Sequence, residues 1–388
     1  MKIRPPWTQS GPGLAQGQAR HGYRVLLVNL DFRDVVYSHF WGRAVLNACT
    51  TRNLTVDMVA VNPFAGRDVA AELGVARAAL DARVDGTAVY LDKPEASQYR
   101  SAVGQLLDRN RYQRLIVNCD ASLFVHLVVD RERDLAGTQW LVYDRHLHID
   151  LPAHDRDTHL RDRIVASDMH VYTIKEIATD TERTSGEEAI IGSFKRLGFT
   201  PERIHLQQWP LDDAFFAPQP DAASKDAFVI FSGGDSGRDY ATLFEAIHDL
   251  PVQLRLCAGN YPTPVPANVT ILPRLPLHRF RDEIARATVV VVPLTGHPLV
   301  SGITVIAMAK MMGKPVIASD NAVARIHVRS QGDGGYLTQT GNAALLRTLL
   351  IGLMESPAER ERLGREARAH AIRDLSLRGF VERMMELE

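Results

Sequence analysis

Short apolar runs alternate with helix-like patterns along the whole chain, and this alternation limits the fold more than any other feature. In the first half, runs that predict strands occupy Tyr23–Leu30, Thr55–Asn62, Thr87–Leu91, Arg114–Asn118, Trp140–Asp144 and Met169–Thr173. In the second half they occupy Ala227–Phe231, Gln253–Cys257, Val269–Leu272, Thr288–Pro293 and Pro315–Ala318. Strands that alternate with helices are typical of βαβ units. The sequence therefore predicts an α/β chain with parallel, doubly wound sheets.

Helical patterns fill the intervals and the C-terminal end. We expect helices at Ser38–Thr51, Glu95–Asn110, Tyr240–Leu250, His278–Ala287, Ile303–Met312, Asn342–Glu355 and along the charged stretch Pro357–Glu388. The segment HLQQWPLDDAFFAPQPDAASKD, which is rich in proline and then polar, is interpreted as a hinge. We therefore expect an N-terminal domain over residues 1–210 and a C-terminal domain over 222–370. The C-terminal helix, residues 371–388, is expected to cross back to the first domain.

Composition narrows the class of protein. The chain has 388 residues, which is long enough for two cores. Its 45 basic and 46 acidic residues leave a net charge of −1, so no overall field favours nucleic acid or an anionic membrane. The three cysteines, Cys49, Cys119 and Cys257, are widely spaced and fit reduced core residues better than disulfides or a metal site. No run reaches the ~20 apolar residues of a transmembrane helix, and the N-terminus lacks a signal-peptide pattern. A cytoplasmic location is expected, contact with a membrane surface stays open, and the oligomeric state is undetermined.

Two glycine-containing loops follow predicted strands of the second domain. The first reads SGGDSGRDY and contains Gly233, Gly234 and Arg238. The second reads LTGHPLVSG and leads directly into the helix expected at Ile303–Met312. Glycine permits close backbone approach, arginine matches phosphate, and a helix start offers free amides to an anion. Each loop alone could be an ordinary βα turn, but two on one face with an arginine predict a diphosphate site. Neither loop is a Walker A or a G-x-G-x-x-G motif, which argues against NTPases and dehydrogenases.

Four segments of the second half resemble the donor-binding domain of GT-B glycosyltransferases, in particular the GT4-like superfamily. They are LDDAFFAPQP, FSGGDSGRDYATLFEAI, NVTILPRLPLHRFRDEIARATVVVVPL and SGITVIAMAKMMGKPVIASD. The resemblance covers about residues 208–320, and the first half is similar in architecture only. It implies a GT-B fold, with two Rossmann-like domains facing a cleft and a C-terminal helix that packs back. It also implies a glycosyltransferase that uses a nucleotide-diphosphate sugar as co-substrate, with no other cofactor.

The chain departs from many of these relatives at two positions. Aligned on Gly313-Lys314-Pro315, the places of their two glutamates are taken by Val300 and Met308, so the chain resembles the subset that opens this segment with Ser-Gly. The second cation that relatives place on the diphosphate is not identifiable.

The donor-site residues implied by the resemblance fall into three groups. The residues expected at the diphosphate are Gly233, Gly234, Arg238, Ser301, Gly302, Ile303 and Thr304. The residues expected beside the nucleobase are Asn260, Arg274 and Leu275. His297 and Leu299 are expected near the sugar.

Candidate catalytic residues lie after strands of the first domain. Asp31, Asp34 and His39 follow the first strand, and Asp144 and His146 end the strand QWLVYD. One of these could take up or steer the acceptor proton. The alternatives stay open: Asp31 is equally suited to a turn or an N-cap, and His39 to a helix start. The His- and Asp-rich segment YDRHLHIDLPAHDRDTHLRDR fits no metal-ligand spacing and predicts a loop, so no metal is expected.

The predicted function is transfer of a sugar from a UDP-sugar to an unidentified acceptor, without a metal and with retention of configuration. Inversion with Asp31, Asp34 or His39 as base stays open. A catalytically silent GT-B module that acts as a scaffold is the main alternative, and a nucleotide-sugar epimerase of the same fold is a weaker one.

Overall fold

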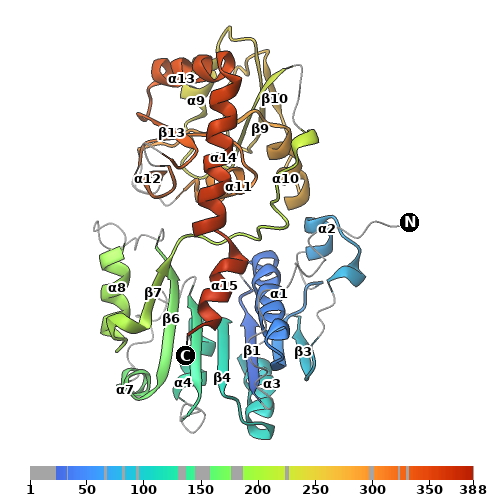
Figure 1. Cartoon of the computed structure of the whole chain (residues 1–388), viewed down its shortest axis with the longest axis vertical. Coiled ribbons are helices and arrows are strands. Elements are labelled where there is room, and N and C mark those ends of the chain that lie inside the picture. Colours follow the sequence, from blue (N-terminus) through green and yellow to red (C-terminus); the bar gives the residue numbers. More distant parts are fainter. Residues whose placement is uncertain are drawn as a thin grey trace. The chain divides into compact units, whose positions relative to one another are not determined.

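The computed structural model describes residues 23–32, 34–64, 68–80, 84–92, 96–129, 137–144, 158–175, 187–222, 227–296, 301–321, 324–328 and 332–387. The contacts divide the chain into two units (Figure 1). Unit 1 comprises Met1–Gln207 with Val381–Glu388, and unit 2 comprises Gln208–Phe380. The domain limits expected from the sequence stay predictions.

Unit 1 is built on a parallel sheet with the strand order β3-β2-β1-β4-β5-β6-β7. In chain order its strands are β1 Arg24–Leu30, β2 Thr55–Val61, β3 Ala88–Leu91, β4 Arg114–Cys119, β5 Gln139–Asp144, β6 Asp168–Ile174 and β7 Ile204–Gln207. Its helices are α1 Val35–Thr51, α2 Val69–Leu73, α3 Ala96–Arg109, α4 Ala121–Val129, α7 Thr158–Ala166 and α8 Glu187–Arg196, with short 3₁₀-helices η2 Arg77–Ala79 and η4 Pro201–Arg203. Strands β1 and β4 are mostly apolar and almost entirely buried, as expected of a parallel sheet covered on both faces.

Unit 2 repeats this architecture with a parallel sheet of order β10-β9-β8-β11-β12-β13. Its strands are β8 Phe228–Gly233, β9 Val252–Cys257, β10 Val269–Ile271, β11 Val289–Val292, β12 Val316–Ser319 and β13 Gly335–Thr338. Its helices are α9 Tyr240–Ile247, α10 Leu277–Arg286, α11 Ile303–Met311, α12 Ala324–His327, α13 Ala343–Glu355 and α14 Pro357–Asp374, with the 3₁₀-helix η5 Pro220–Ala222. The predicted α/β fold class with two doubly wound parallel sheets is confirmed.

The last helical stretch differs from the single helix that its pattern predicts. α14 ends at Asp374, and α15 begins anew at Leu377 and runs to Met385. Between them the backbone pairs with Leu211, whose amide donates to Leu375 O at 2.8 Å and whose carbonyl accepts from Leu377 N at 2.8 Å. These long-range bonds replace helical ones, so a pattern read along one segment could not reveal the break.

The end of the chain is anchored on unit 1. Arg114, which is buried, donates from Nη1 to Met385 O at 3.1 Å and from Nη2 to Leu387 O at 2.6 Å. Arg52 pairs with Glu382 at 2.6 Å. An arginine at the carbonyl end of a helix satisfies acceptors that have no intrahelical partner and opposes the negative end of the helix dipole.

Other cations of the chain cap helices in the same way. Lys314 donates to Ala285 O and Ala287 O at the end of α10, at 2.6 and 2.9 Å. Arg360 donates to Leu353 O and Met354 O at the end of α13, at 2.6 and 3.0 Å. Arg347 donates to Ala246 O and His248 O at the end of α9. Arg368 on α14 donates to the carbonyl of Met311, the last residue of α11. These four basic residues thus cap the C-terminal ends of helices.

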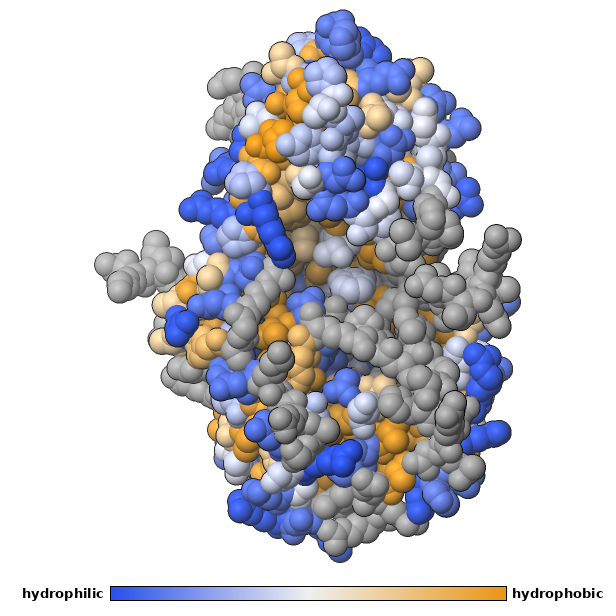
Figure 2. Space-filling view, turned by 180° about the vertical axis from the view of Figure 1, so that it is seen from behind, coloured by the Kyte–Doolittle hydropathy of each residue, from blue (hydrophilic) through white to orange (hydrophobic). Residues whose placement is uncertain are grey.

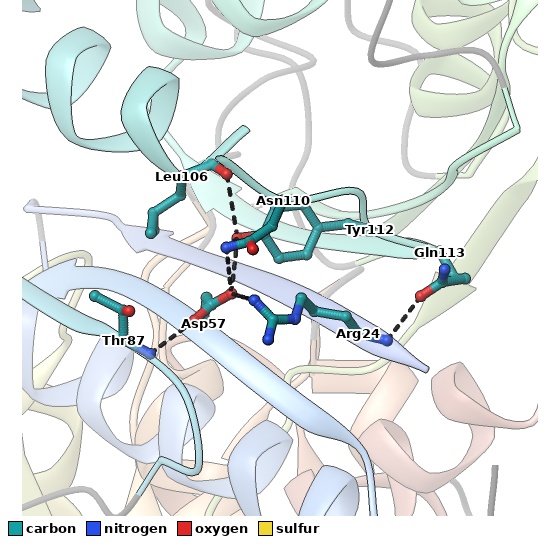
Figure 3. Close-up of polar contacts among 7 residues, drawn as sticks. All are labelled: Arg24, Asp57, Thr87, Leu106, Asn110, Tyr112 and Gln113. Atoms are coloured by element: carbon teal, nitrogen blue, oxygen red, sulfur yellow. Dashed lines mark hydrogen bonds and ion pairs between the residues drawn. The ribbon is translucent and has the colours of Figure 1, made fainter. Parts of the chain in front are cut away.

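The buried carboxylate of Asp57, on β2, links β2 to neighbouring segments of unit 1 (Figure 3). Asp57 accepts from Tyr112 Oη at 2.8 Å, from Arg24 Nη1 at 3.1 Å and from Asn110 Nδ2 at 3.3 Å, all at Oδ2. Its Oδ1 accepts from Thr87 N at 2.7 Å. The side chain of Asp57 is 2% exposed, so these four donors replace the water that a charged carboxylate would otherwise bind.

Candidate functional site

The strand order of each sheet reverses at one point, and in such sheets ligands bind beyond the carboxyl ends of the strands at the reversal. In unit 2 the reversal lies between β8 and β11. The loop after β8 contains Gly233, Gly234 and Arg238, and the loop after β11 leads into α11. The topology therefore brings both predicted phosphate loops to the reversal point of one sheet.

The loop after β8 is held by its own side chains. Arg238 donates from Nε to Gly233 O at 3.1 Å and from Nη1 to Ser236 O at 2.7 Å. The hydroxyl of Tyr240 hydrogen-bonds to Gly234 O. Burial lowers the pKa of Arg238 below its ordinary value and raises that of Tyr240 to about 12. Arg238 is thus a fixed cation whose guanidinium shapes the loop as well as charging it.

Hydrogen bonds between main-chain atoms join this loop to the segment that follows β11. Thr295 N donates to Gly237 O at 2.9 Å, and Asp239 N donates to Pro293 O at 3.0 Å. Gly237 has a positive φ of 59°, and a Cβ placed on it would lie 2.9 Å from Ser301 Oγ. The two predicted loops are therefore in contact, and Gly237, the third glycine of the first loop, lies where they meet.

Helix α11 begins without a capping side chain. Gly302 occupies the N-cap position with a φ of 86°, and no side chain bonds to the first turn. A Cβ on Gly302 would lie 3.0 Å from Val292 Cγ1 and 3.1 Å from Leu294 Cδ2. The amides of Ile303 and Thr304 in this first turn therefore have neither an intrahelical nor a capping acceptor among the described residues. Together with the helix dipole they favour an anion.

The loops after β9 and β10 lie farther along the same edge. Asp235 accepts from Gly259 N at 2.7 Å and Asn260 N at 3.1 Å, which ties the loop after β8 to the loop after β9. The thiol of Cys257 lies 3.5 Å from Pro273 O, next to Arg274 and Leu275. Burial raises the pKa of Cys257, and a hydrogen bond from the Leu275 backbone opposes this shift. Of the residues expected beside the nucleobase, Asn260 is thus held by Asp235, and the backbone of Leu275 lies against Cys257.

Lysines near α11 do not add a cation to this edge. The ammonium group of Lys314 donates to the carbonyls that end α10. Lys310 is fully buried and donates to His327 O. Both positions are at the far end of α11 from Gly302, so neither supplies the second cation that the sequence left unidentified.

The candidate catalytic residues of unit 1 occupy different environments. Asp34 is the N-cap of α1, with Oδ1 accepting from Tyr37 N at 3.0 Å, so the capping role considered for Asp31 belongs to Asp34. Asp31 is buried, and its carbonyl accepts from Ser38 Oγ at 2.8 Å. Asp144 is fully buried and accepts from Thr173 Oγ1 at 2.8 Å. Burial, with a smaller effect of Arg43, lowers the pKa of His39 to about 3. His39 is therefore neutral at pH 7 and holds a proton weakly, which argues against it as a general base.

Buried amides that the sequence analysis passed over lie at the carboxyl edge of this sheet. Asn118 donates to Asn29 Oδ1 at 2.9 Å, and Asn29 donates to Ser38 O at 2.7 Å. A Cβ on Gly42 would lie 2.6 Å from Asn29 Nδ2, so α1 approaches the strand closely there. β1 and β4 are the strands between which the order of this sheet reverses. The signal was present as asparagines inside the apolar runs YRVLLVNL and RLIVNC.

Several expectations fall outside the described residues. His146, His297, Leu299 and Val300 belong to this group. Of the segment predicted as a His- and Asp-rich loop, the described part from Thr158 onward forms helix α7 instead. Within the described residues there is no cluster of three His, Cys, Asp or Glu side chains that could hold a metal ion.

Comparison with known proteins gives structural relatives only. No family model and no curated protein sequence matches the chain. A glycosyltransferase from Rickettsia africae superposes with a TM-score of 0.61 at 10% identity, covering 95% of this chain and 100% of that chain. HepE from Anabaena in complex with UDP-glucose gives 0.56 at 15% identity and covers 94% and 98%. Sucrose-phosphate synthase from Thermosynechococcus elongatus gives 0.58 at 16% identity and covers 94% and 98%. The chain has the GT-B fold.

The GT-B fold accounts for the doubled architecture, since each unit carries its own parallel sheet and its own reversal point. On the face drawn in Figure 2, hydrophilic and hydrophobic residues of the described part are interspersed. The large exposed hydrophobic side chains lie on four separate elements, at Tyr90, Val165, Leu345 and Ile372. None of the described helices combines the length and apolar character needed to cross a bilayer.

Proposed function

We propose that the chain is a glycosyltransferase that moves a sugar from a nucleotide-diphosphate donor, a UDP-sugar, to an acceptor that its residues do not identify. The start of α11 carries this proposal. An uncapped helix start lies against a glycine loop with a fixed arginine, and all of these groups converge at the reversal point of one sheet. The GT-B structures described above, one of them with UDP-glucose bound, support it.

The reaction does not require the protein to form a covalent bond with the substrate. The bond from the sugar C1 to the β-phosphate oxygen breaks, a bond from an acceptor oxygen to C1 forms, and the acceptor proton is removed. Negative charge develops on the departing diphosphate, where groups fixed in advance stabilise it most. We assign this role to Arg238 and to the amides of Ile303 and Thr304, which supply positive charge without a metal ion.

Proton removal is proposed for the carboxyl edge of unit 1. Of the candidate carboxylates, Asp31 directly follows β1 and Asp144 ends β5; His146 stays a candidate. Asp34 is engaged as a helix cap, and His39 is a weak base.

We propose retention of configuration. It is tested by NMR of the sugar released when water acts as acceptor, because the first anomer to form reports the stereochemistry directly.

The donor class is tested by thermal unfolding with UDP, GDP, dTDP, CMP and ADP, each with and without Mg²⁺. A ligand at 100 times its dissociation constant adds about 2.7 kcal/mol to the free energy of unfolding, which is readily measured. We expect UDP to stabilise the protein equally with and without the metal. Stabilisation that needs Mg²⁺ would remove the metal-independent part of the proposal.

Two substitutions at Arg238 separate charge from loop shape. Arg238→Ala should abolish most of the shift, whereas Arg365→Ala, an exposed arginine of α14, should leave it intact. Arg238→Lys keeps the charge but loses the fork that binds Gly233 and Ser236. Partial retention in the lysine variant would assign Arg238 a charge role. Complete loss would assign it the positioning of the loop. If no nucleotide stabilises the wild-type protein, the donor site is wrong and a silent GT-B module becomes the better description.

A further inference from the structure

Asp235 stands out at the carboxyl edge of unit 2 because it is an acidic residue beside a site proposed to hold a diphosphate. Its Oδ1 accepts from two consecutive backbone amides, Gly259 N at 2.7 Å and Asn260 N at 3.1 Å. These bonds fix the carboxylate between the ends of β8 and β9. Asp235 is exposed, and its Oδ2 forms no hydrogen bond within the described part of the chain. One oxygen therefore holds the loop, and the other is left for a further donor.

The chemistry of Asp235 Oδ2 limits the groups that it could bind. An ionised carboxylate is an acceptor only, so its partner has to be a donor. Like charges repel, which excludes a phosphate as its direct partner. Neutral O–H and N–H donors remain. Of the donors on a nucleoside diphosphate, the two ribose hydroxyls lie nearer the diphosphate than the N–H groups of the base do.

The order of the strands indicates where the ribose would lie. Neighbouring strands are about 4.8 Å apart, and the diphosphate is proposed over the ends of β8 and β11. A nucleoside attached there extends either over β9 and β10 or over β12. On the β12 side, Asp320 binds Arg325 with both oxygens, at 2.6 and 2.9 Å. On the β9 side, Asp235 keeps one oxygen for a ligand.

We propose that Asp235 binds a ribose hydroxyl of the donor nucleotide, so that the site selects ribonucleoside diphosphates over their deoxy analogues. This inference rests on the proposed function, because it needs a nucleotide at this edge. It adds a specificity-determining residue and narrows the donor to those built on ribose.

The test compares matched nucleotides by isothermal titration calorimetry. UDP, 2′-deoxy-UDP and 3′-deoxy-UDP are titrated into the wild-type protein, Asp235→Asn and Asp320→Asn. Asparagine keeps a carbonyl oxygen for the amides of Gly259 and Asn260, so the loop is retained, but the charge and one acceptor are lost. We expect the wild-type protein to bind at least one deoxy analogue about tenfold more weakly than UDP. The ratio should approach one in Asp235→Asn and stay unchanged in Asp320→Asn.

Pyrophosphate serves as a probe of charge alone. Removing a negative group near the diphosphate should leave its affinity unchanged or raise it, so a loss seen only with UDP belongs to the ribose. If the wild-type protein binds UDP and both deoxy analogues equally, or if Asp235→Asn keeps the wild-type ratio, the inference is wrong and the proposed function stands. If neither UDP nor pyrophosphate binds the wild-type protein, the proposed function falls and this inference falls with it.

Discussion

Gly237 lies in contact with Ser301: a Cβ atom on Gly237 would be 2.9 Å from the Ser301 hydroxyl oxygen. This approach joins the loop after β8 to the residue that precedes the N-cap of α11. The φ of Gly237 is 59°, a conformation that other residues adopt at a cost of about 1–2 kcal/mol. Two independent reasons therefore favour glycine here, one in the backbone and one in the contact with Ser301.

The first prediction separates these two reasons. Gly237→Ala and Gly341→Ala both place alanine at a positive φ, but nothing lies within 4 Å of a Cβ on Gly341. Both variants should lose about 1–2 kcal/mol of stability in chemical unfolding. Only Gly237→Ala should also weaken UDP binding, by about tenfold, because it displaces Ser301. Equal UDP affinity in the two variants would show that the contact does not shape the donor site.

Arg114 supports a second prediction, on the C-terminal end of the chain. Its guanidinium holds Met385 O and Leu387 O, and it is 4% exposed. Arg114→Met leaves the buried Met385 carbonyl and the half-buried Leu387 carbonyl without their donor and should cost about 1–3 kcal/mol. We expect carboxypeptidase to shorten this variant faster than the wild-type protein. Arg111→Ala, an exposed neighbour, is the control, and equal rates of cleavage in all three proteins would argue against the anchoring role.

The buried side chain of His370 leads to a prediction about how the stability of unit 2 depends on pH. Burial, followed by the charge of Lys310, lowers the pKa of His370 from 6.5 to about 4. Between these values the unfolded chain binds a proton that the folded chain does not, so the free energy of unfolding falls as the pH falls through this window. His370→Gln should therefore show a shallower decline between about pH 6.5 and 4 in urea unfolding. His248→Gln, whose side chain is 72% exposed, should retain the wild-type slope. The same slope in both variants would exclude His370 as the source.

The carboxylate in Figure 3 gives a prediction about stability alone. Asp57→Asn would turn an amide group toward donors that now share one oxygen, among them Tyr112 Oη and Arg24 Nη1. A loss of about 1–3 kcal/mol is expected, as for a buried hydrogen-bonding group left without its partner, since the Arg24 side chain of the ion pair is 35% exposed. Tyr112→Phe removes one hydrogen bond and should cost about 1 kcal/mol. Neither variant that remains folded should change UDP affinity, because the network belongs to unit 1; a change in affinity would show that unit 1 affects the donor site through this network.

The elements that the sequence predicted well are those with a strong periodic signal of their own. The apolar runs that became β1, β4, β8 and β11 were located to within two residues, because strands buried on both faces are continuously apolar. The edge strands β7 and β13 were missed. Their sequences, IHLQ and GYLT, are four residues long and mixed in polarity, so pairing with a neighbour decides their conformation.

The same distinction applies to the candidate site. Glycine loops, Arg238 and the Ser-Gly start of α11 could be proposed from the sequence, because backbone freedom and helix ends depend on local chemistry. Their roles as ligands stay predictions. The contacts of Asp235, Gly237 and Cys257 could not be found in this way, since their partners lie 16 to 64 positions away in the sequence.

The sequence by itself determined that this chain forms parallel sheets from βαβ units, because hydrophobic periodicity and glycine placement act within a few residues. Only the tertiary structure decided which cations terminate helices, where the last helix breaks, and which carboxylate joins the loops after β8 and β9. Those outcomes depend on partners brought together by folding, such as Arg114 and Leu387, or Asp235 and Gly259. A hydrogen bond has one geometry in space and no fixed spacing in sequence, so it leaves no local pattern to read.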